Sequence, residues 1–400
     1  MRRFCSVLGV CLFLGLCSAA QDLSDKKQYD ELRAHALELF KGNNFLAALP
    51  ELQKLADENP KDAGVLEALG FALASRALLE TDNDARRSER IAARKYLIAA
   101  KQLGDHSEML TYLLETTPED GTPRKFSDNN EINKLMQSAE THFARGELEE
   151  AKAGYLQVLL LDSDNYLATL FTGDVYFKQQ QFGSACQWFQ KAIEVQPDVE
   201  TAYRYWGDAL DRMGRPEEAR RKFIEAIVAE PYNSSSSQHL AAWMKVRGLP
   251  LAIPRIQSPN SVTVDGAQKI NINIDPSSIG KQDGSDAWML YSINRAAWQK
   301  DLFKKNFPNE QQYRHSLKEE HDSLALVVSS VKGNNDIKAL NPQIALLVKI
   351  SDAGMLDPYI LLNSADQGIA QDYVAYRKEH RELLYKYLDT IVVPQLKPAL

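Results

Sequence analysis

Cysteine is scarce in this chain of 400 residues: it has four, and three of them, Cys5, Cys11 and Cys17, lie in the first 17 positions. If that stretch is removed, Cys186 is the only cysteine left, so a disulfide within the remaining chain is excluded. A single cysteine in a helical repeat indicates a small packed side chain rather than a nucleophile.

An apolar run long enough to cross a membrane is also lacking. The run from Val7 to Leu16 is too short for a spanning helix. It follows the basic residues Arg2 and Arg3 and precedes the small residues at 18–20, an order that predicts a secretory signal peptide over residues 1–20. A helix buried at the N-terminus of the fold is the alternative.

The sequence Leu14-Gly15-Leu16-Cys17 is similar to the bacterial lipoprotein box. That family has a small residue where Leu16 stands, so we expect no lipid anchor at Cys17.

Basic residues do not outnumber acidic ones. Removing the two arginines of the signal leaves 45 basic residues against 54 acidic ones, a net charge of −9. This balance argues against a general affinity for nucleic acid or for an anionic membrane. The apolar content of 44% and charged content of 25% are those of an ordinary globular chain, long enough for two or three domains.

The motifs of common enzyme classes are absent. The chain has no Gly-x-Ser-x-Gly elbow, phosphate loop, His-Glu-x-x-His, Cys-x-x-Cys or dinucleotide fingerprint. The segment Asp283-Gly284-Ser285-Asp286 lacks the alternating acidic residues of a calcium loop, so we interpret it as a turn. We expect no enzyme activity and no cofactor.

A period of 34 residues runs through the centre of the chain, from Ile132 to Asn233. Two small positions, one aromatic position and a position that is proline in two units recur at this step. These sets are Ala139, Gly173 and Gly207; Ala151, Ala185 and Ala219; Tyr155, Phe189 and Phe223; and Ser163, Pro197 and Pro231. Small residues let two antiparallel helices approach closely, and proline ends the second helix. The period therefore predicts three stacked helix pairs.

The last unit reads Tyr203-x2-Trp206-Gly207-x2-Leu210, then Ala219-x3-Phe223 and Pro231. This resembles the tetratricopeptide repeat (TPR) pattern. The resemblance implies a mainly α fold, an α-solenoid whose concave wall holds an extended peptide or a partner helix and whose repeats carry no chemistry.

The period continues upstream in a weaker form, so that two repeats precede the three central ones. The first covers residues 29–62, and the second opens around Gly70, 34 residues after Ala36. The second helix of that unit comes late, with Ala93, Leu97 and Ala100 as its packing positions. We therefore expect eleven inserted residues around Glu80 to Asp84 to form a loop on one face.

These patterns divide the chain into five parts: a signal peptide (1–20), N-terminal TPR-like repeats with an insertion (21–115), a linker (116–131), three TPR repeats plus a capping helix (132–248), and a C-terminal hairpin and helical module (249–400). A short helix is expected from Ser107 to Glu115. The sequence leaves open whether this helix bridges the two arrays or whether the arrays pivot there.

The period is gone from Leu249 onward, and a small, mostly helical α+β module is expected. Alternating residues on either side of Asp265-Gly266 predict a β-hairpin. Four helices should follow, over 286–306, 311–332, 342–353 and 365–392, the last opened by a capping box of Ser364 and Gln367. The region looks like the C-terminal part of some uncharacterised secreted bacterial TPR proteins, which implies no activity.

Several side chains of this module are of the types that bind metals: His315, Glu319, Glu320, His321, Glu379 and His380. His315 and Glu319 share a helix face, so a metal site is possible if two helices meet there. The residues interleaved with them, Lys318, Arg377, Lys378 and Arg381, are typical of a solvated face. We adopt that interpretation and expect no metal.

A row of carboxylates follows the small residue of each central first helix. In TPR domains this position faces the groove. The residues expected to line a partner-binding groove are Glu140, Phe143, Asp174, Phe177, Arg204, Asp208 and Asp211. Chaperone-binding TPR proteins grip a terminal carboxylate with basic and Asn residues, but Met136 and Leu170 stand at two of those places. An acidic wall beside phenylalanines should instead prefer Lys or Arg next to apolar side chains. A solvated acidic face is the alternative.

We therefore expect an exported TPR scaffold or adaptor, located in the periplasm or elsewhere in the bacterial cell envelope, that binds a protein or peptide partner in its groove. No nucleic acid partner is expected, and no transmembrane segment after removal of the signal. The alternative is an unrecognised hydrolase or metal-dependent enzyme in residues 249–400, with the repeats recruiting its substrate.

Overall fold

The computed structural model describes residues 26–42, 44–80, 82–105, 107–264, 269–333 and 339–396. The chain divides into two compact units, one that ends at Trp188 and one that begins at Phe189. The expected signal peptide, Cys17 and the Asp265-Gly266 turn lie outside the described residues.

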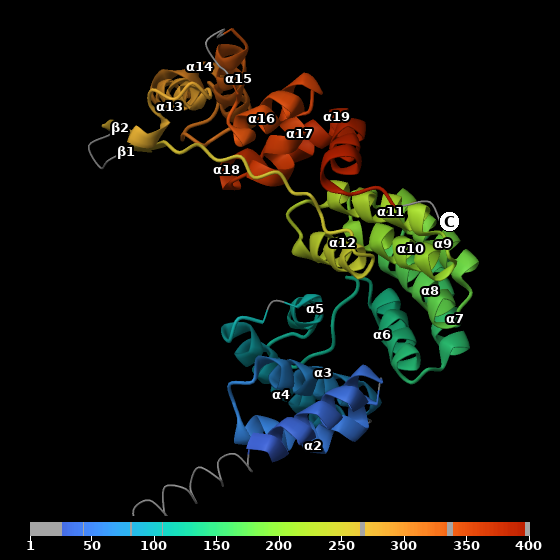
Figure 1. Cartoon of the computed structure of the whole chain (residues 1–400). Helices are drawn as coiled ribbons and strands as arrows, with labels where there is room; N and C mark the ends of the chain where they lie inside the picture. The colour runs from blue at the N-terminus through green and yellow to red at the C-terminus, as the bar shows by residue number, and fades with distance from the viewer. Residues whose placement is uncertain are drawn as a thin grey trace, which may run out of the picture. The chain divides into compact units, whose positions relative to one another are not determined.

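Antiparallel helix pairs make up the first unit (Figure 1). A helix over residues 26–41 is followed by α2 (Phe45–Glu58), α3 (Ala63–Leu79), α4 (Asn83–Gln102), α5 (Glu108–Thr116), α6 (Asn130–Ala144), α7 (Leu148–Leu161) and α8 (Tyr166–Lys178). The next helix, α9 (Phe182–Val195), contains the division between the units.

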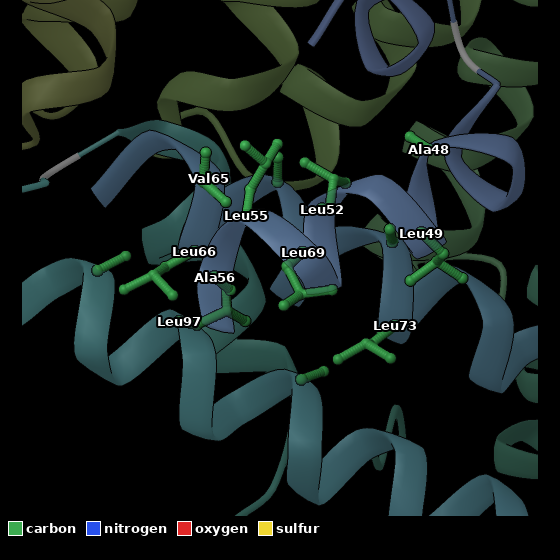
Figure 2. Close-up of a cluster of buried hydrophobic side chains, with 14 of the residues drawn as sticks. Ala48, Leu49, Leu52, Leu55, Ala56, Val65, Leu66, Leu69, Leu73 and Leu97 are labelled. Carbon is green, nitrogen blue, oxygen red and sulfur yellow. The ribbon is translucent and has the colours of Figure 1, made fainter. Parts of the chain in front are cut away.

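The core of the N-terminal pairs is aliphatic, and Figure 2 shows Leu52, Leu55, Leu69 and Leu97 within it. All four side chains are fully buried. At Gly70 a Cβ would lie 2.7 Å from Leu97 Cγ, so only glycine permits this approach of α3 and α4. The two N-terminal helix pairs predicted from the weak period are confirmed.

The prediction of a loop around Glu80 to Asp84 is wrong, because the extra residues lengthen helices instead. α3 has 17 residues and α4 has 20, against 14 in α7 and 13 in α8. The turn between α3 and α4 is short because Asp82 caps α4, its carboxylate accepting from the Ala85 N–H at 2.8 Å. Arg86 adds a hydrogen bond from Nε to the Glu80 carbonyl at 3.0 Å.

The predicted short helix is α5, and Ser107 is its N-cap. The residues between α5 and α6, numbers 117–129, form no helix or strand. α3 contacts both α5 and α6. Within the first unit, the N-terminal helices therefore pack directly on the start of the central repeats.

The second unit continues the helix pairs with α10 (Glu200–Arg212), α11 (Pro216–Ala229) and α12 (Ser234–Val246). At Gly207 a Cβ would lie 2.4 Å from Phe223 Cε1. The aromatic ring of α11 thus occupies the space that the missing side chain of α10 leaves, as the 34-residue pattern predicts. α12 packs on both α10 and α11 and buries Leu240 and Met244, which confirms it as a further packed helix after the last pair.

A two-stranded antiparallel sheet begins the C-terminal module, and helices follow it. The strands are β1 (Ser261–Val264) and β2 (Ile270–Asn273), with Val262 opposite Ile272. The helical elements are η1 (Pro276–Ser278), η2 (Ser285–Ala287), α13 (Trp288–Ala297), the π-turn η3 (Trp298–Leu302), α14 (Phe303–Asn306), α15 (Leu317–Gly333), α16 (Pro342–Asp352), α17 (Leu356–Tyr359), the π-turn η4 (Ile360–Ser364), α18 (Gln367–Ala370), α19 (Tyr373–Tyr387) and the π-turn η5 (Leu388–Val392). Both strands pack on α13, so the hairpin gains the support it needs.

Two of the predicted helices of this module differ from the structure, and one helical segment was not predicted. α15 begins at Leu317 rather than at 311, because the Ser316 hydroxyl caps it by accepting from Glu319 N–H. The last helix is broken before α19, and Asp366 rather than Ser364 is the cap of α18. The unpredicted segment, α17 and η4, has a mainly apolar buried side that includes Ile360 and Leu361.

The C-terminal helices dock on the last helix pair of the second unit. The Tyr373 hydroxyl donates to the Val228 carbonyl at 2.7 Å, and the Tyr232 hydroxyl donates to the Leu361 carbonyl at 3.0 Å. Arg377 donates to the Ala229 carbonyl. The expected boundary at 248/249 therefore falls inside one compact unit. None of the helices in the described part of the chain has the length and apolar content that crossing a membrane requires.

Candidate functional site

The first residue of the expected carboxylate row, Glu140 on α6, makes an internal contact. Tyr155 on α7 donates its hydroxyl to Glu140 Oε1 at 2.5 Å. Burial raises the pKa of Glu140, while the Tyr155 hydroxyl and the Arg124 guanidinium act in the opposite direction. Burial, followed by the charge of Glu140, raises the pKa of Tyr155. The carboxylate of Glu140 is thus shielded from solvent, and its charge acts on the groups beside it.

Two predicted groove carboxylates in the second unit, Asp208 of the row and Asp211 one turn further on, are paired with residues of α12 or its C-cap. Asp208 Oδ1 lies 2.8 Å from His239 Nε2, and Arg247 donates Nη2 to Asp211 Oδ1 at 2.5 Å. A partner that contacted Asp208 or Asp211 would have to compete with these pairs. Asp208 and Asp211 thus lie where the capping helix α12 covers the last repeat.

The remaining predicted groove residues are divided between the units. Phe143, Asp174 and Phe177 belong to the first unit and are half-buried. The ring of Phe177 packs edge-on against Phe182, with 5.3 Å between centroids. Arg204 belongs to the second unit and donates Nε to Glu200 at 3.1 Å. Met136 and Leu170, which stand at the same repeat position as Arg204, are core residues that offer no surface.

An extended segment of the chain itself lies on α6. We call residues 122–127 the arm. Its backbone is held by two side chains one helical turn apart: Gln137 Nε2 donates to the Arg124 carbonyl at 3.1 Å, and the Phe126 N–H donates to Asn133 Oδ1 at 2.8 Å. Pro123 restricts its own φ and disfavours helix for the residue before it, which favours an extended path. α6 thus binds the backbone of the arm by pairing one carbonyl and one N–H.

The side chains of the arm rest on aromatic rings. The guanidinium of Arg124 lies 4.9 Å from the Phe126 centroid and 5.9 Å from that of Tyr112 on α5. Phe126 packs edge-on against Phe171 of α8, with 6.5 Å between centroids, and Phe171 in turn contacts Tyr155 at 5.7 Å. Burial raises the pKa of the Tyr112 hydroxyl, and the nearby charges of Glu140 and Asp174 raise it further, whereas Arg124 lowers it. Arg124 therefore contacts a ring on which both predicted carboxylates act, and it also interacts with the charge of Glu140.

The chain just before the arm is fixed separately, to α4. Arg94 Nη1 donates to the Leu114 and Thr117 carbonyls at 2.5 and 2.6 Å, and Arg87 Nε donates to the Asp120 carbonyl at 2.6 Å. Arg90 Nη1 reaches the Gly121 carbonyl at 3.5 Å. These arginines are spaced by three and four residues and so share one face of α4.

Sequence reasoning placed Glu140 and Asp174 near this site but missed Asn133, Gln137 and Phe171. Asn133 and Gln137 lie seven and three residues before Glu140, hence on the same face of α6. This helical spacing indicates that Asn133 and Gln137 share the predicted groove face with Glu140. The arm itself was predicted only as a linker, because a bound extended segment has no periodicity of its own.

A second polar centre lies in the C-terminal module, between α13 and α15. Arg295 donates Nε to Glu319 at 2.7 Å and Nη1 to Glu320 at 3.2 Å. The hydroxyls of Tyr313 and Tyr291 donate to Glu319 and Glu320, each at 2.9 Å. Glu319 is fully buried and Glu320 is 7% exposed. The predicted solvated face is therefore wrong here, because Arg295 from α13 supplies the cation that lets both carboxylates be buried.

His315 belongs to the same network, whereas His321 and His380 do not. His315 Nε2 lies 3.0 Å from Glu320 Oε2, and its Nδ1 lies 2.7 Å from Asp366 Oδ2. Burial opposes charge on this ring, but the two carboxylates outweigh it, so the pKa of His315 is raised. His321 pairs with Asp357, and His380 lies beside Glu379. Over the ranges that the structure describes, no three or more His, Cys, Asp or Glu side chains are grouped to hold a metal ion.

A cavity of about 380 Å³ borders this network. Its polar wall includes Arg295, Glu320 and Asn260, and its apolar wall includes Trp288 and Leu324. The Asn260 Nδ2 atom is buried without a hydrogen-bond partner. The alternative of an enzyme in this module would be favoured by a polar pocket ringed by His315, Glu319 and His380, and none of these three lines this cavity.

Comparison with known proteins agrees with the repeat geometry over part of the chain. Residues 136–200 match the tetratricopeptide repeat family. Among solved structures, the first TPR of Spaghetti (RPAP3) bound to an HSP90 peptide is similar at 20% identity, covering 31% of this chain and 98% of that chain, with a TM-score of 0.28. YrrB, a TPR protein with an unusual peptide-binding site, is similar at 14% identity, covering 51% of this chain and 87% of its own, with a TM-score of 0.25.

A third similar structure is MamA, residues 41 to the end, from Desulfovibrio magneticus RS-1. It has 15% identity and a TM-score of 0.24, and the match covers 52% of this chain and 97% of that one. The family match and the helix pairs themselves indicate the repeat fold. The match thus identifies residues 136–200 of the chain as tetratricopeptide repeats.

Proposed function

We propose that this chain is an exported TPR scaffold that binds an extended segment of a protein partner on α6 and α8 of its first unit. One observation carries the proposal: α6 already holds an extended backbone through Asn133 and Gln137. A carbonyl acceptor and an amide donor on one helix face recognise a peptide backbone of any sequence, and neighbouring side chains then select among sequences.

The selecting surface favours a basic residue next to an apolar one. Phe171 offers an aromatic ring. The charge of Glu140 acts on Arg124, and the charges of Glu140 and Asp174 both act on Tyr112, which Arg124 contacts. We expect association with such a partner to slow as salt rises, because these charges steer the encounter.

The C-terminal module has a structural part in this proposal. Its helix α19 packs on α11, and Arg220 of α11 is buried there. The last helix pair therefore does not end at an open face. Terminal repeats of a solenoid need such a cover.

Export and location in the bacterial cell envelope are part of the proposal. They are supported by the order of basic, apolar and small residues over 1–20. The partner is then another protein of the envelope.

Affinity capture tests the function. The chain that starts at Gln21, with Arg124→Ser and Phe126→Ser so that its own arm no longer competes, is immobilised and exposed to an envelope fraction. The affinity of the captured partner is measured without and with the double substitution Asn133→Ala, Gln137→Ala. We expect the double variant to bind at least about tenfold more weakly, since it loses two hydrogen bonds at the interface. Gln190→Ala is the matched control, because Gln190 bonds only its helix neighbour Glu194. Equal binding by a double variant with unchanged circular dichroism would contradict the proposed site.

A further inference from the structure

We infer that the arm is an internal stand-in for the partner: it occupies the peptide site on α6 and α8, and a partner segment with a basic residue two positions before an aromatic one displaces it. This inference rests on the proposed function and adds the sequence pattern of the partner and a competition that regulates access.

The contacts of the arm are those of a bound peptide. In an extended chain, residues two apart point to the same side. Arg124 and Phe126 accordingly both face the wall of the site, where they contact Tyr112 and Phe171. Lys125, between them, is exposed and pairs only with Asp128 nearby in the chain. The site therefore reads the first and third positions of an Arg-x-Phe segment and ignores the second.

The contacts of the arm with α6 are not needed to hold the chain that precedes it. Four of the preceding carbonyls accept hydrogen bonds from Arg87, Arg90 and Arg94 of α4; they are those of Leu114, Thr117, Asp120 and Gly121. At Gly121, which has φ +70°, a Cβ would lie 2.5 Å from the Arg87 carbonyl, so this point is tightly packed. The anchored part ends at Gly121, and the arm begins one residue later. The arm can leave α6 while the anchor on α4 stays in place.

The arm is also held weakly enough to be displaced. Its backbone makes two hydrogen bonds to α6, its aromatic contact is at the long end of the range for ring pairs, and both Arg124 and Phe126 are only half-buried. The arm stays bound because it is tethered, which gives it an effective concentration in the millimolar range. A partner of the same pattern with further contacts would overcome that advantage.

The test uses the full chain and a peptide copy of its own arm. The fluorescent peptide Gly-Thr-Pro-Arg-Lys-Phe-Ser-Asp-Asn, residues 121–129, is titrated into the wild type and into the double variant Arg124→Ser, Phe126→Ser. We expect the variant, whose arm no longer fits, to bind the peptide at least tenfold more tightly than the wild type. A control peptide with serine in place of Arg and Phe should not bind. Adding Asn133→Ala and Gln137→Ala to the variant should abolish binding of the first peptide.

A folded variant that binds neither peptide, or both equally, would overturn the inference. If the variant does not fold, hydrogen exchange on the wild type decides. The Phe126 amide should exchange faster in the presence of several millimolar peptide while the amides of α6 keep their protection, and an unchanged Phe126 amide would count against displacement. If a captured partner binds the wild type and the arm variant with equal affinity, the proposed scaffold function is retained. Only the inference that the arm stands in for the partner is then rejected.

Discussion

The guanidinium of Arg220 on α11 is buried against Asp389, which lies 169 residues further along the chain. Arg220 is 1% exposed, and its Nη1 lies 2.5 Å from Asp389 Oδ1. Its Nε donates to the Pro394 carbonyl at 3.0 Å, and its Nη2 donates to the carbonyls of Asp389 and Val393 at 3.0 and 2.7 Å. One side chain of α11 thus holds η5 and the residues that follow it, as far as Pro394.

Arg220→Ala should therefore destabilise the second unit by about 3–5 kcal/mol, because it leaves buried acceptors unpaired. Urea unfolding measures the change. Arg221→Ala, at the exposed neighbouring position, is the control and should cost less than about 0.5 kcal/mol. Equal effects of the two substitutions would mean that the pair to Asp389 does not hold the module.

Gly207→Ala should cost about 1–3 kcal/mol, because its Cβ would lie 2.4 Å from Phe223 Cε1 and the ring must move. Gly183→Ala is a matched control on α9: nothing lies within 4 Å of its Cβ, and it should be neutral or slightly stabilising. Thermal unfolding of both variants gives the comparison. A stable Gly207→Ala variant would contradict the close packing of α10 and α11.

His315 should make the stability of the second unit depend on pH. Its pKa in the folded state is raised above the ordinary value of 6.5 by Glu320 and Asp366, against burial and the charge of Arg295. Its stabilising contribution is therefore fully present below about pH 6.5 and is lost as the pH rises through the folded pKa. His315→Gln should lose about 1–3 kcal/mol at pH 6 and less at pH 9.

The matched control for His315 is His380→Gln, since His380 is exposed beside Glu379. Unfolding measured at several pH values should show the same profile for this control as for the wild type. A His315→Gln variant whose loss is independent of pH would show that the ring is not charged in the folded protein.

Intact-mass measurement on the chain recovered from the bacterial cell envelope should give the mass of a chain that begins at or near Gln21. The order of basic, apolar and small residues over 1–20 is the reason. A mass that includes those residues would contradict export by a cleaved signal. Added acyl chains would contradict the expectation that Cys17 carries no lipid.

The helix pairs were predictable because their packing repeats at a fixed local spacing. Gly207 and Phe223 are 16 residues apart, and the same small-to-large pairing returns every 34 residues, so the sequence alone shows which helix faces which. Prolines and glycines mark most helix ends for an equally local reason. The insertion near Asp82 was placed correctly, but its conformation was not, because a single cap decided between a loop and a longer helix.

The amino-acid sequence by itself therefore determined the TPR pairs, the core positions of α10 and α11 and the row of carboxylates beside the small residues. Only the tertiary structure decided that Asp208 and Asp211 are paired with α12, that Glu319 and Glu320 are buried with Arg295, and that the arm lies on α6. The physical reason is that a single charge pair or a backbone bound in an extended conformation leaves no period in the sequence. Which residue becomes the partner depends on where the chain folds back, as for Arg220 and Asp389.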